Sequence, residues 1–183
     1  MDKWSDRVSY TGGSDWWDSP AGALASVEMF PEEGAPLSLG VHASSGFLTL
    51  DTAVTPARNV TAGSTLVAVV CWGGGTAGAA TIEDSADNIW SQIGSPLGPT
   101  PVGSYSVRGA MYVCEDCIGS AALVVTATRN GEYPSIAYQE FKGSDLSFGD
   151  VASGPLDTTS PFASTSVTPT TDGAAVSSGF VHN

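Results

Sequence analysis

The sequence predicts an all-β protein: a two-sheet β-sandwich, of jelly-roll or immunoglobulin-like type, with an extended N-terminal arm. Charged residues make up only 14% of the 183 residues, and small and β-branched residues fill much of the rest. This composition favours strands and turns over long amphipathic helices. From Gly46 onward, short apolar runs recur between turn signals, which is typical of a sandwich. A chain of this length can also bury a core of its own.

Residues 1–45 are expected to form the arm, because they combine several Gly and Pro residues with little sustained alternation. One short element is expected inside the arm, at Leu24–Phe30. The preceding Pro20 can begin a helix, whereas alternating apolar residues within the segment fit a strand. The sequence leaves both possibilities open.

Residues 46–183 are expected to form the sandwich domain. The run Leu66–Trp72 is apolar on both faces, which is typical of a central strand covered on two sides, with the arm as one candidate cover. Tyr105–Val113 alternates more plainly, so one of its faces is expected to be exposed to solvent. Nine strands are predicted in all: Phe47–Val54, Ser64–Trp72, Thr81–Glu83, Ile89–Ile93, Tyr105–Val113, Ala121–Thr128, Ser135–Lys142, Ser164–Thr168 and Ala174–Val181.

A single core between the two sheets should collect the inward side chains of these strands. Its expected members are Leu66, Ala68, Val70, Trp90, Val107, Met111, Leu123, Val125 and Tyr138.

The charge of the chain limits the kinds of molecule that it is expected to bind. Six basic and 19 acidic residues give a formal net charge of −13, which repels phosphate backbones and anionic membrane surfaces. The longest apolar run is also far too short to span a bilayer. We therefore expect no nucleic-acid and no membrane partner. The first residues lack a basic and an apolar signal region, so either the chain is used without export or a leader was removed.

Several local patterns, taken in order, resemble a β-sandwich domain that recurs in bacteriophage virion proteins (capsid decorations and tail fibres) and in modular bacterial surface proteins. The similarity covers about residues 60–180. Each pattern is weak alone, and their order carries the resemblance. Lys142 departs from the pattern, where such domains often have a small or polar residue. The patterns are Ala62–Val70, Asp84–Trp90, Ala121–Thr128, Ala137–Gly143 and Pro155–Asp157.

The resemblance implies a non-enzymatic structural or assembly protein, a component of a phage virion such as a capsid decoration or a fibre. Its partners would be other protein subunits of the same assembly, either copies of itself or a capsid or tail protein. The alternative is a carbohydrate-binding or adhesive module of a bacterial surface protein, extracellular or on the cell surface. A hydrolase on a sandwich fold is a third hypothesis.

Four aromatic residues of the arm are the candidate partner-binding residues: Trp4, Tyr10, Trp16 and Trp17. Large rings bury much area at low entropic cost, so they can anchor the arm on a partner or stack on sugar rings. They can equally fold back on their own sandwich.

Cys114 and Cys117 have the spacing of a redox pair or of half a zinc site. They lie between two predicted strands and beside acidic residues, which raise a thiol pKa. We therefore expect a turn, with either a local disulfide or two thiols, and no metal.

The segment Asp84–Asn88 offers enough oxygen atoms for calcium, but it lacks the EF-hand spacing, and a turn is the simpler interpretation. Catalytic patterns are absent from the sequence. The two histidines, His42 and His182, are poorly placed for a Ser-His pair, although Ser44 and Ser45 lie near the first. We expect no catalytic residue and no cofactor.

Overall fold

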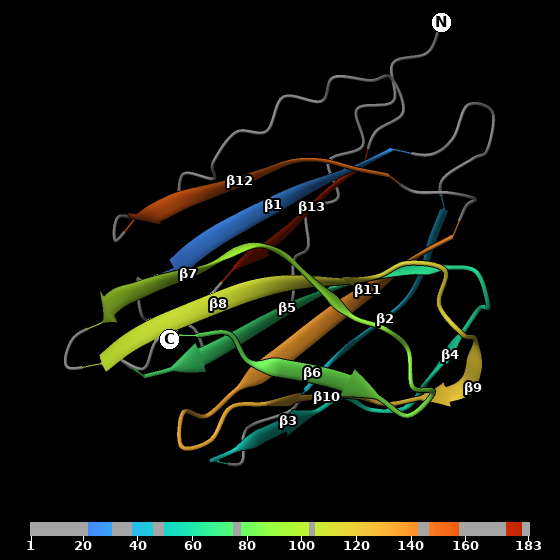
Figure 1. Cartoon of the computed structure of the whole chain (residues 1–183), viewed down its shortest axis with the longest axis horizontal. Helices are drawn as coiled ribbons and strands as arrows, with labels where there is room; N and C mark the ends of the chain where they lie inside the picture. Colours follow the sequence, from blue (N-terminus) through green and yellow to red (C-terminus); the bar gives the residue numbers. More distant parts are fainter. Residues whose placement is uncertain are drawn as a thin grey trace, which may run out of the picture.

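The computed structural model describes residues 22–30, 38–45, 50–74, 78–102, 105–142, 147–157 and 175–180. Within this part of the chain every regular element is a strand and none is a helix, as the composition predicts (Figure 1). The strands are β1 (Gly22–Phe30), β2 (Ser38–Ser44), β3 (Thr52–Val54), β4 (Arg58–Val60), β5 (Thr65–Gly73), β6 (Thr81–Asp84), β7 (Ser91–Val102), β8 (Tyr105–Cys114), β9 (Ser120–Leu123), β10 (Val125–Thr128), β11 (Ser135–Lys142), β12 (Ser147–Asp157) and β13 (Ala175–Phe180).

A five-stranded antiparallel sheet with the order β2-β11-β5-β8-β7 forms the middle of the molecule. A three-stranded sheet, β3-β10-β6, lies against one of its faces, and the short pair β4-β9 continues that layer at one end (Figure 1). All neighbouring strands run antiparallel. The described chain is therefore all-β, with the packed antiparallel sheets of a β-sandwich.

The main core fills the space between these two layers. Leu66, Leu123 and Val125 have no exposed area, and Trp72 lies among the largest fully buried side chains. Burying each of these side chains removes apolar area from water, which is the dominant favourable contribution to folding. The remaining core members are mainly small or β-branched, as the composition requires.

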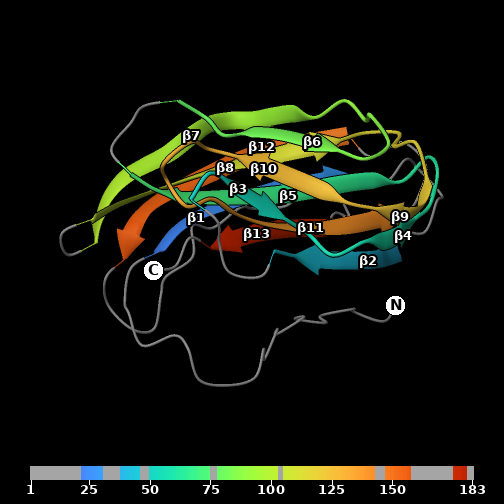
Figure 2. The same cartoon turned by 90° about the horizontal axis from the view of Figure 1, so that it is seen from below.

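A second three-stranded sheet, β12-β1-β13, covers the opposite face of the central sheet (Figures 1 and 2). Val67 and Met111 lie on that face and are almost fully buried, at 3% and 2% exposed. The central strand β5 is thus covered on both sides, which explains why its sequence is apolar without alternation. The cover includes β1, from the range that was expected to be an arm.

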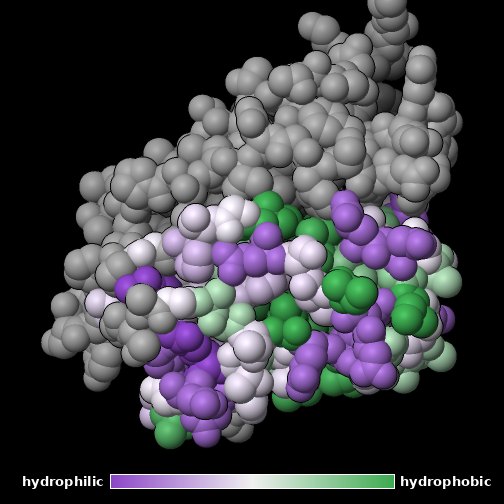
Figure 3. Space-filling view, viewed as in Figure 1, coloured by the Kyte–Doolittle hydropathy of each residue, from purple (hydrophilic) through white to green (hydrophobic). Residues whose placement is uncertain are grey.

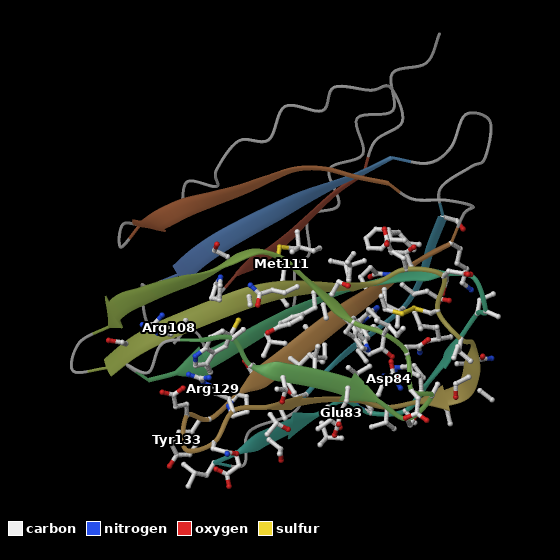
Figure 4. The ribbon with its side chains drawn as sticks, in the orientation of Figure 1. Glu83, Asp84, Arg108, Met111, Arg129 and Tyr133 are labelled. Carbon is white, nitrogen blue, oxygen red and sulfur yellow. A yellow bond between two sulfur atoms is a disulfide. The ribbon has the colours of Figure 1, made fainter. Side chains whose placement is uncertain are left out.

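The expectation of one core is wrong for two residues. Val107 and Met111 pair with Gly73 and Val69, whereas the core residues Ala68 and Val70 pair with Tyr112 and Ala110, which lie on the other face of β8. Because side chains alternate along a strand, Val107 and Met111 point to the β1 side of the sheet. Figure 4 shows Met111 on that side. The other expected residues belong to the main core, with Trp90 partly buried against it.

The expectation of a solvent-exposed face on Tyr105–Val113 is also wrong. Arg108, Ala110 and Tyr112 on one face of β8 are buried, as is Met111 on the other. The reason is the third layer, the sheet β12-β1-β13, because a strand that is covered by sheets on both faces has no solvent-exposed face.

The sequence left open whether Leu24–Phe30 is a helix or a strand, and it is part of strand β1. Strands β2, β4 and β12 were not predicted. The apolar pattern of β2 is interrupted by Gly, Ser and His, and β4 has only three residues. Strand β12 contains two Gly and one Pro. Strands β1 and β2 lie within the range expected to be an arm, and both pair with strands from later in the chain. The predicted strand Ser164–Thr168 lies outside the described residues.

Candidate functional site

A shallow hollow of about 530 Å³ lies at the corner where β6 ends and β10 begins. Its lining contains the segment that offered oxygen ligands for calcium. Glu83 and Asp87 are exposed there, whereas Asp84 is buried. Figure 4 shows Glu83 and Asp84 at this corner. The lining residues are Ile82, Glu83, Asp84, Ser85, Asp87, Asn88, Val124 and Thr126.

The Asp84 carboxylate binds protein N–H groups with both oxygens. Its Oδ1 accepts hydrogen bonds from the backbone N–H of Ala86 at 2.8 Å and of Asn88 at 3.3 Å. Its Oδ2 accepts one from the Trp90 indole N–H at 2.7 Å. A carboxylate engaged in this way shapes a turn and fixes the ring that follows it.

Asn88 extends this turn to a second loop. Its Oδ1 accepts a hydrogen bond from the Ile118 N–H at 2.6 Å, and its Nδ2 donates to Asp84 Oδ1 at 3.2 Å. The loop after β6 is thereby attached to the loop after β8. Among the described residues, no three His, Cys, Asp or Glu side chains are grouped so that they could hold a metal ion.

The structure decides between the two possibilities for the cysteine pair, since Cys114 and Cys117 form a disulfide. The loop that this disulfide closes is also tied to a neighbouring turn. Cys117 N–H donates to the Ser64 carbonyl and Gly63 N–H donates to the Cys117 carbonyl, both at 2.9 Å. The pair therefore stands in a structural turn, as the acidic flanks indicated.

Burial raises the pKa of the third cysteine, Cys71, to about 12, although a hydrogen bond with Ser135 lowers it. A thiol with such a pKa stays protonated at neutral pH and is a poor nucleophile.

Glu140 is a buried structural carboxylate that the sequence analysis did not single out. It has no exposed area, and it points into the sandwich from the same face of β11 as Tyr138 and Ile136. Oε2 accepts a hydrogen bond from the Val41 N–H and Oε1 accepts one from the Thr61 N–H, both at 2.8 Å. The alternation of β11 was the signal that could have placed this glutamate inside.

Burial alone would raise the pKa of Glu140, but the N–H groups of Thr61 and Val41 and the charge of Lys142 together lower it. Lys142 Nζ lies 3.7 Å from Oε2. A Cβ atom at position 40 would collide with this side chain, so a larger residue than Gly40 would displace the Glu140 carboxylate. Glu140 thus joins β2, β11 and the turn after β4.

A third buried carboxylate, that of Glu132, lies at the opposite end of the sandwich from Glu140. Glu132 Oε2 accepts a hydrogen bond from Arg129 Nε at 2.5 Å, and Arg129 Nη1 donates to the Ala79 carbonyl at 3.1 Å. The guanidinium also lies over the Trp72 ring, 5.6 Å from its centroid. Figure 4 places Arg129 at this end, away from Asp84.

The residues considered for hydrolysis are not brought into a catalytic arrangement in the described part of the chain. His42 is exposed on β2, and Ser45 Oγ accepts a hydrogen bond from the Ile136 N–H at 3.1 Å. That contact holds the start of β11 in place. His182 lies outside the described residues.

The four candidate partner-binding residues, Trp4, Tyr10, Trp16 and Trp17, also lie outside the described residues. Within the described part, the exposed large hydrophobic residues include one aromatic, Tyr133. Figure 3 shows hydrophobic residues scattered among hydrophilic ones on the face over β6 and β10. The exposed set is Leu39, Leu50, Val54, Ile89, Ile118 and Tyr133.

The fold and these contacts define a class, an all-β protein with packed antiparallel sheets and structural buried carboxylates. Comparison with known protein families, with curated proteins and with solved structures finds no match. The described residues include no helix with the length and apolar character needed to cross a membrane.

Proposed function

We propose that this protein is a non-enzymatic structural component, and specifically the displayed sandwich of a bacteriophage virion, either a capsid decoration or a fibre. The observation that carries the proposal is the use of the buried carboxylates. The Glu140 carboxylate accepts hydrogen bonds from backbone N–H groups, and that of Asp84 accepts them from backbone N–H groups and an indole. The Glu132 carboxylate binds a guanidinium. Buried charges that are hydrogen-bonded in this way rigidify a fold, so these carboxylates hold the structure together.

The edges of the central sheet support the same proposal. The edge strand β7 contains Pro96, Pro99 and Pro101 and two irregularities in its pairing with β8. At the other edge, Arg58 Nε donates to the His42 carbonyl of β2 at 3.3 Å. Proline, bulges and a covering charge are devices that prevent uncontrolled strand addition at an edge. A protein displayed at high density on a particle needs such protection.

A jelly-roll sandwich is the finer assignment that we propose for the fold. Going along the chain, β2, β5, the pair β7-β8 and β11 belong to the central sheet, while β3, β6 and β10 between them belong to the second sheet. The first of these strands lies beside the last. Such crossing from sheet to sheet is typical of double Greek keys, whereas an immunoglobulin-type sandwich keeps its first two strands in one sheet.

Contacts with neighbouring subunits are assigned to the segment before β1, which carries Trp4, Tyr10, Trp16 and Trp17. Strand β1 itself pairs with β12 and β13 of the same chain. The part of the expected arm that we propose to contact other subunits is therefore residues 1–21. The particle would contain this chain beside copies of itself or beside a capsid or tail protein. Residence in the virion follows from the proposal.

The test is the sedimentation of the full chain at high concentration, compared with a chain that lacks residues 1–20. This truncation keeps β1 and β2, which lie within the range 1–45 that was expected to be the arm. We expect the full chain to form oligomers and the truncated chain to stay folded and monomeric. Ala replacements of Trp4, Trp16 and Trp17 should weaken association without changing the melting temperature. A full chain that remains monomeric, or a truncation that associates equally well, contradicts self-assembly through this segment.

The carbohydrate-binding alternative requires aromatic rings in a row across one sheet. Among the residues whose exposure the structure describes, the large exposed hydrophobic side chains include one aromatic, Tyr133, which lies in the connection between β10 and β11 rather than on a sheet face. The assembly proposal is therefore preferred.

A further inference from the structure

The connection between β10 and β11 contains an exposed Asn-Gly pair. Asn130 and Gly131 are both exposed, and Gly131 has a φ of +75° with no atom within 4 Å of the place where a Cβ would be. Glycine adopts this conformation without strain. The pair is thus a solvent-facing tight turn with no side chain on its second residue.

An asparagine followed by glycine carries its own chemical reactivity. The backbone nitrogen of Gly131, once it loses its proton, can attack Cγ of Asn130. The new N–Cγ bond closes a succinimide ring, and the side-chain nitrogen leaves as ammonia. Water then opens the ring at either carbonyl, which gives aspartate or isoaspartate. The reaction needs no reagent besides water, and the missing Cβ of Gly131 removes the main steric obstacle.

In the folded chain a hydrogen bond holds the backbone nitrogen of Gly131, which is the attacking atom. Gly131 N–H donates a hydrogen bond to Asp51 Oδ1 at 2.8 Å. The Asp51 carbonyl also accepts from the Arg129 N–H at 2.8 Å, and the Leu50 carbonyl accepts from the Tyr133 N–H at 3.0 Å. Both sides of the Asn-Gly pair are therefore fixed to residues 50–51.

The Asp51 contact opposes the reaction in two ways. It must break before the nitrogen can reach Cγ, and the carboxylate charge disfavours the amide anion that attacks. A carboxylate is far too weak a base to remove an amide proton, so catalysis by Asp51 is not expected. We propose that Asn130 is a site of spontaneous deamidation, and that Asp51 sets its rate in the folded protein by holding the Gly131 N–H.

The modification would alter a structurally important turn. It places a new carboxylate near Asp51, and isoaspartate adds a methylene to the backbone between Arg129 and Glu132. The Glu132 carbonyl accepts a hydrogen bond from the Gly73 N–H at 2.8 Å, and its side chain binds Arg129. Deamidation should therefore weaken the hydrogen bonds at this end of the sandwich and lower the stability of the protein over time.

The experiment follows deamidation of the full chain by peptide mapping with mass spectrometry, during incubation at mildly alkaline pH. Wild type is compared with Asp51→Ala, which removes the acceptor, and with Asp51→Asn, which keeps an acceptor oxygen without the charge. Asn88, followed by the bulky Ile89, is an internal control in the same digest. Each chain is also incubated in denaturant.

We expect folded D51A to deamidate at Asn130 about tenfold faster than folded wild type, which corresponds to about 1.4 kcal/mol. The deamidation rate of Asn130 in D51N should lie between those of wild type and D51A. The deamidation rate of Asn88 should be similar in all three folded chains. In denaturant all three chains should react at one common, faster rate, which separates loss of the contact from loss of the fold. Equal folded rates for wild type and D51A would overturn the proposal. So would a slower rate in D51A, or a folded wild type that reacts as fast as the denatured chain.

Discussion

The carboxylate of Glu140 accepts a hydrogen bond from the backbone N–H of Val41, although 99 positions separate the two residues. The same side chain accepts a second bond from the Thr61 N–H. One buried charge thus connects β2, β11 and the turn after β4. Because the Glu140 side chain has no exposed area, losing these partners would leave a buried charge without hydrogen bonds, so the contacts have a direct consequence for stability.

Replacing Glu140 with Gln should lower the free energy of unfolding by about 1–3 kcal/mol, because the amide group would present a donor to one of two N–H donors. Chemical denaturation measures this. Glu83→Gln on β6, where the side chain is exposed, is the matched control and should change little. An equal effect of both variants would contradict the role assigned to Glu140.

Stability should also fall in acid because of Glu140. Its pKa is lower in the folded chain than its ordinary value, so the folded state binds fewer protons than the unfolded state. The stabilisation is complete above the unfolded pKa and is lost as pH falls through the folded pKa, from about pH 5 downward. Denaturation at a series of pH values tests this. E140Q should show a shallower acid decline, and an unchanged slope would argue against the assignment.

The contact between Asp84 and Trp90 should be energetically coupled. In a double-mutant cycle with Asp84→Asn and Trp90→Phe, we expect a coupling free energy of about 1–2 kcal/mol, because the 2.7 Å bond joins a carboxylate to a partly buried indole. The cycle is measured by urea denaturation. Additive single effects would mean that the bond contributes nothing to stability.

Two buried tyrosines should respond in opposite ways to loss of their hydroxyl groups. Tyr112 OH donates to the Ala80 carbonyl at 2.5 Å, so Tyr112→Phe should destabilise by about 1 kcal/mol or more. The Tyr138 hydroxyl is buried and has no hydrogen-bond partner in the structure, so Tyr138→Phe should be neutral or stabilising. Thermal melts of the two variants provide the comparison. A clear loss of stability in Y138F would show that its hydroxyl has a partner.

Removal of metal ions should leave the melting temperature nearly unchanged. Both oxygens of Asp84 accept hydrogen bonds from N–H groups, which leaves the loop poorly suited to calcium. A ligand that binds only the folded state must lower the melting temperature when it is removed. Calorimetry before and after dialysis against a chelator measures this. A large drop that calcium restores would contradict our interpretation of the turn.

The all-β class, the central position of Leu66–Trp72 and most of the main core could be predicted from the sequence, because composition and local apolar runs are properties of neighbouring residues. The sequence also placed the turns at Asp84–Asn88 and Cys114–Cys117. These features depend on local chemistry, since a short side chain hydrogen-bonds to the backbone a few positions away.

The face that each strand buries, and the contacts between residues far apart in the sequence, could not be predicted without the folded structure. Met111 is buried on the β1 side because a third sheet covers that face, and nothing in the alternation of β8 announces a second cover. Glu140 meets Val41 and Thr61, and Asp51 meets Gly131, across separations of 79 to 99 positions. Such contacts depend on strand order and register, which are set by the packing of all the sheets together rather than by any local run of residues.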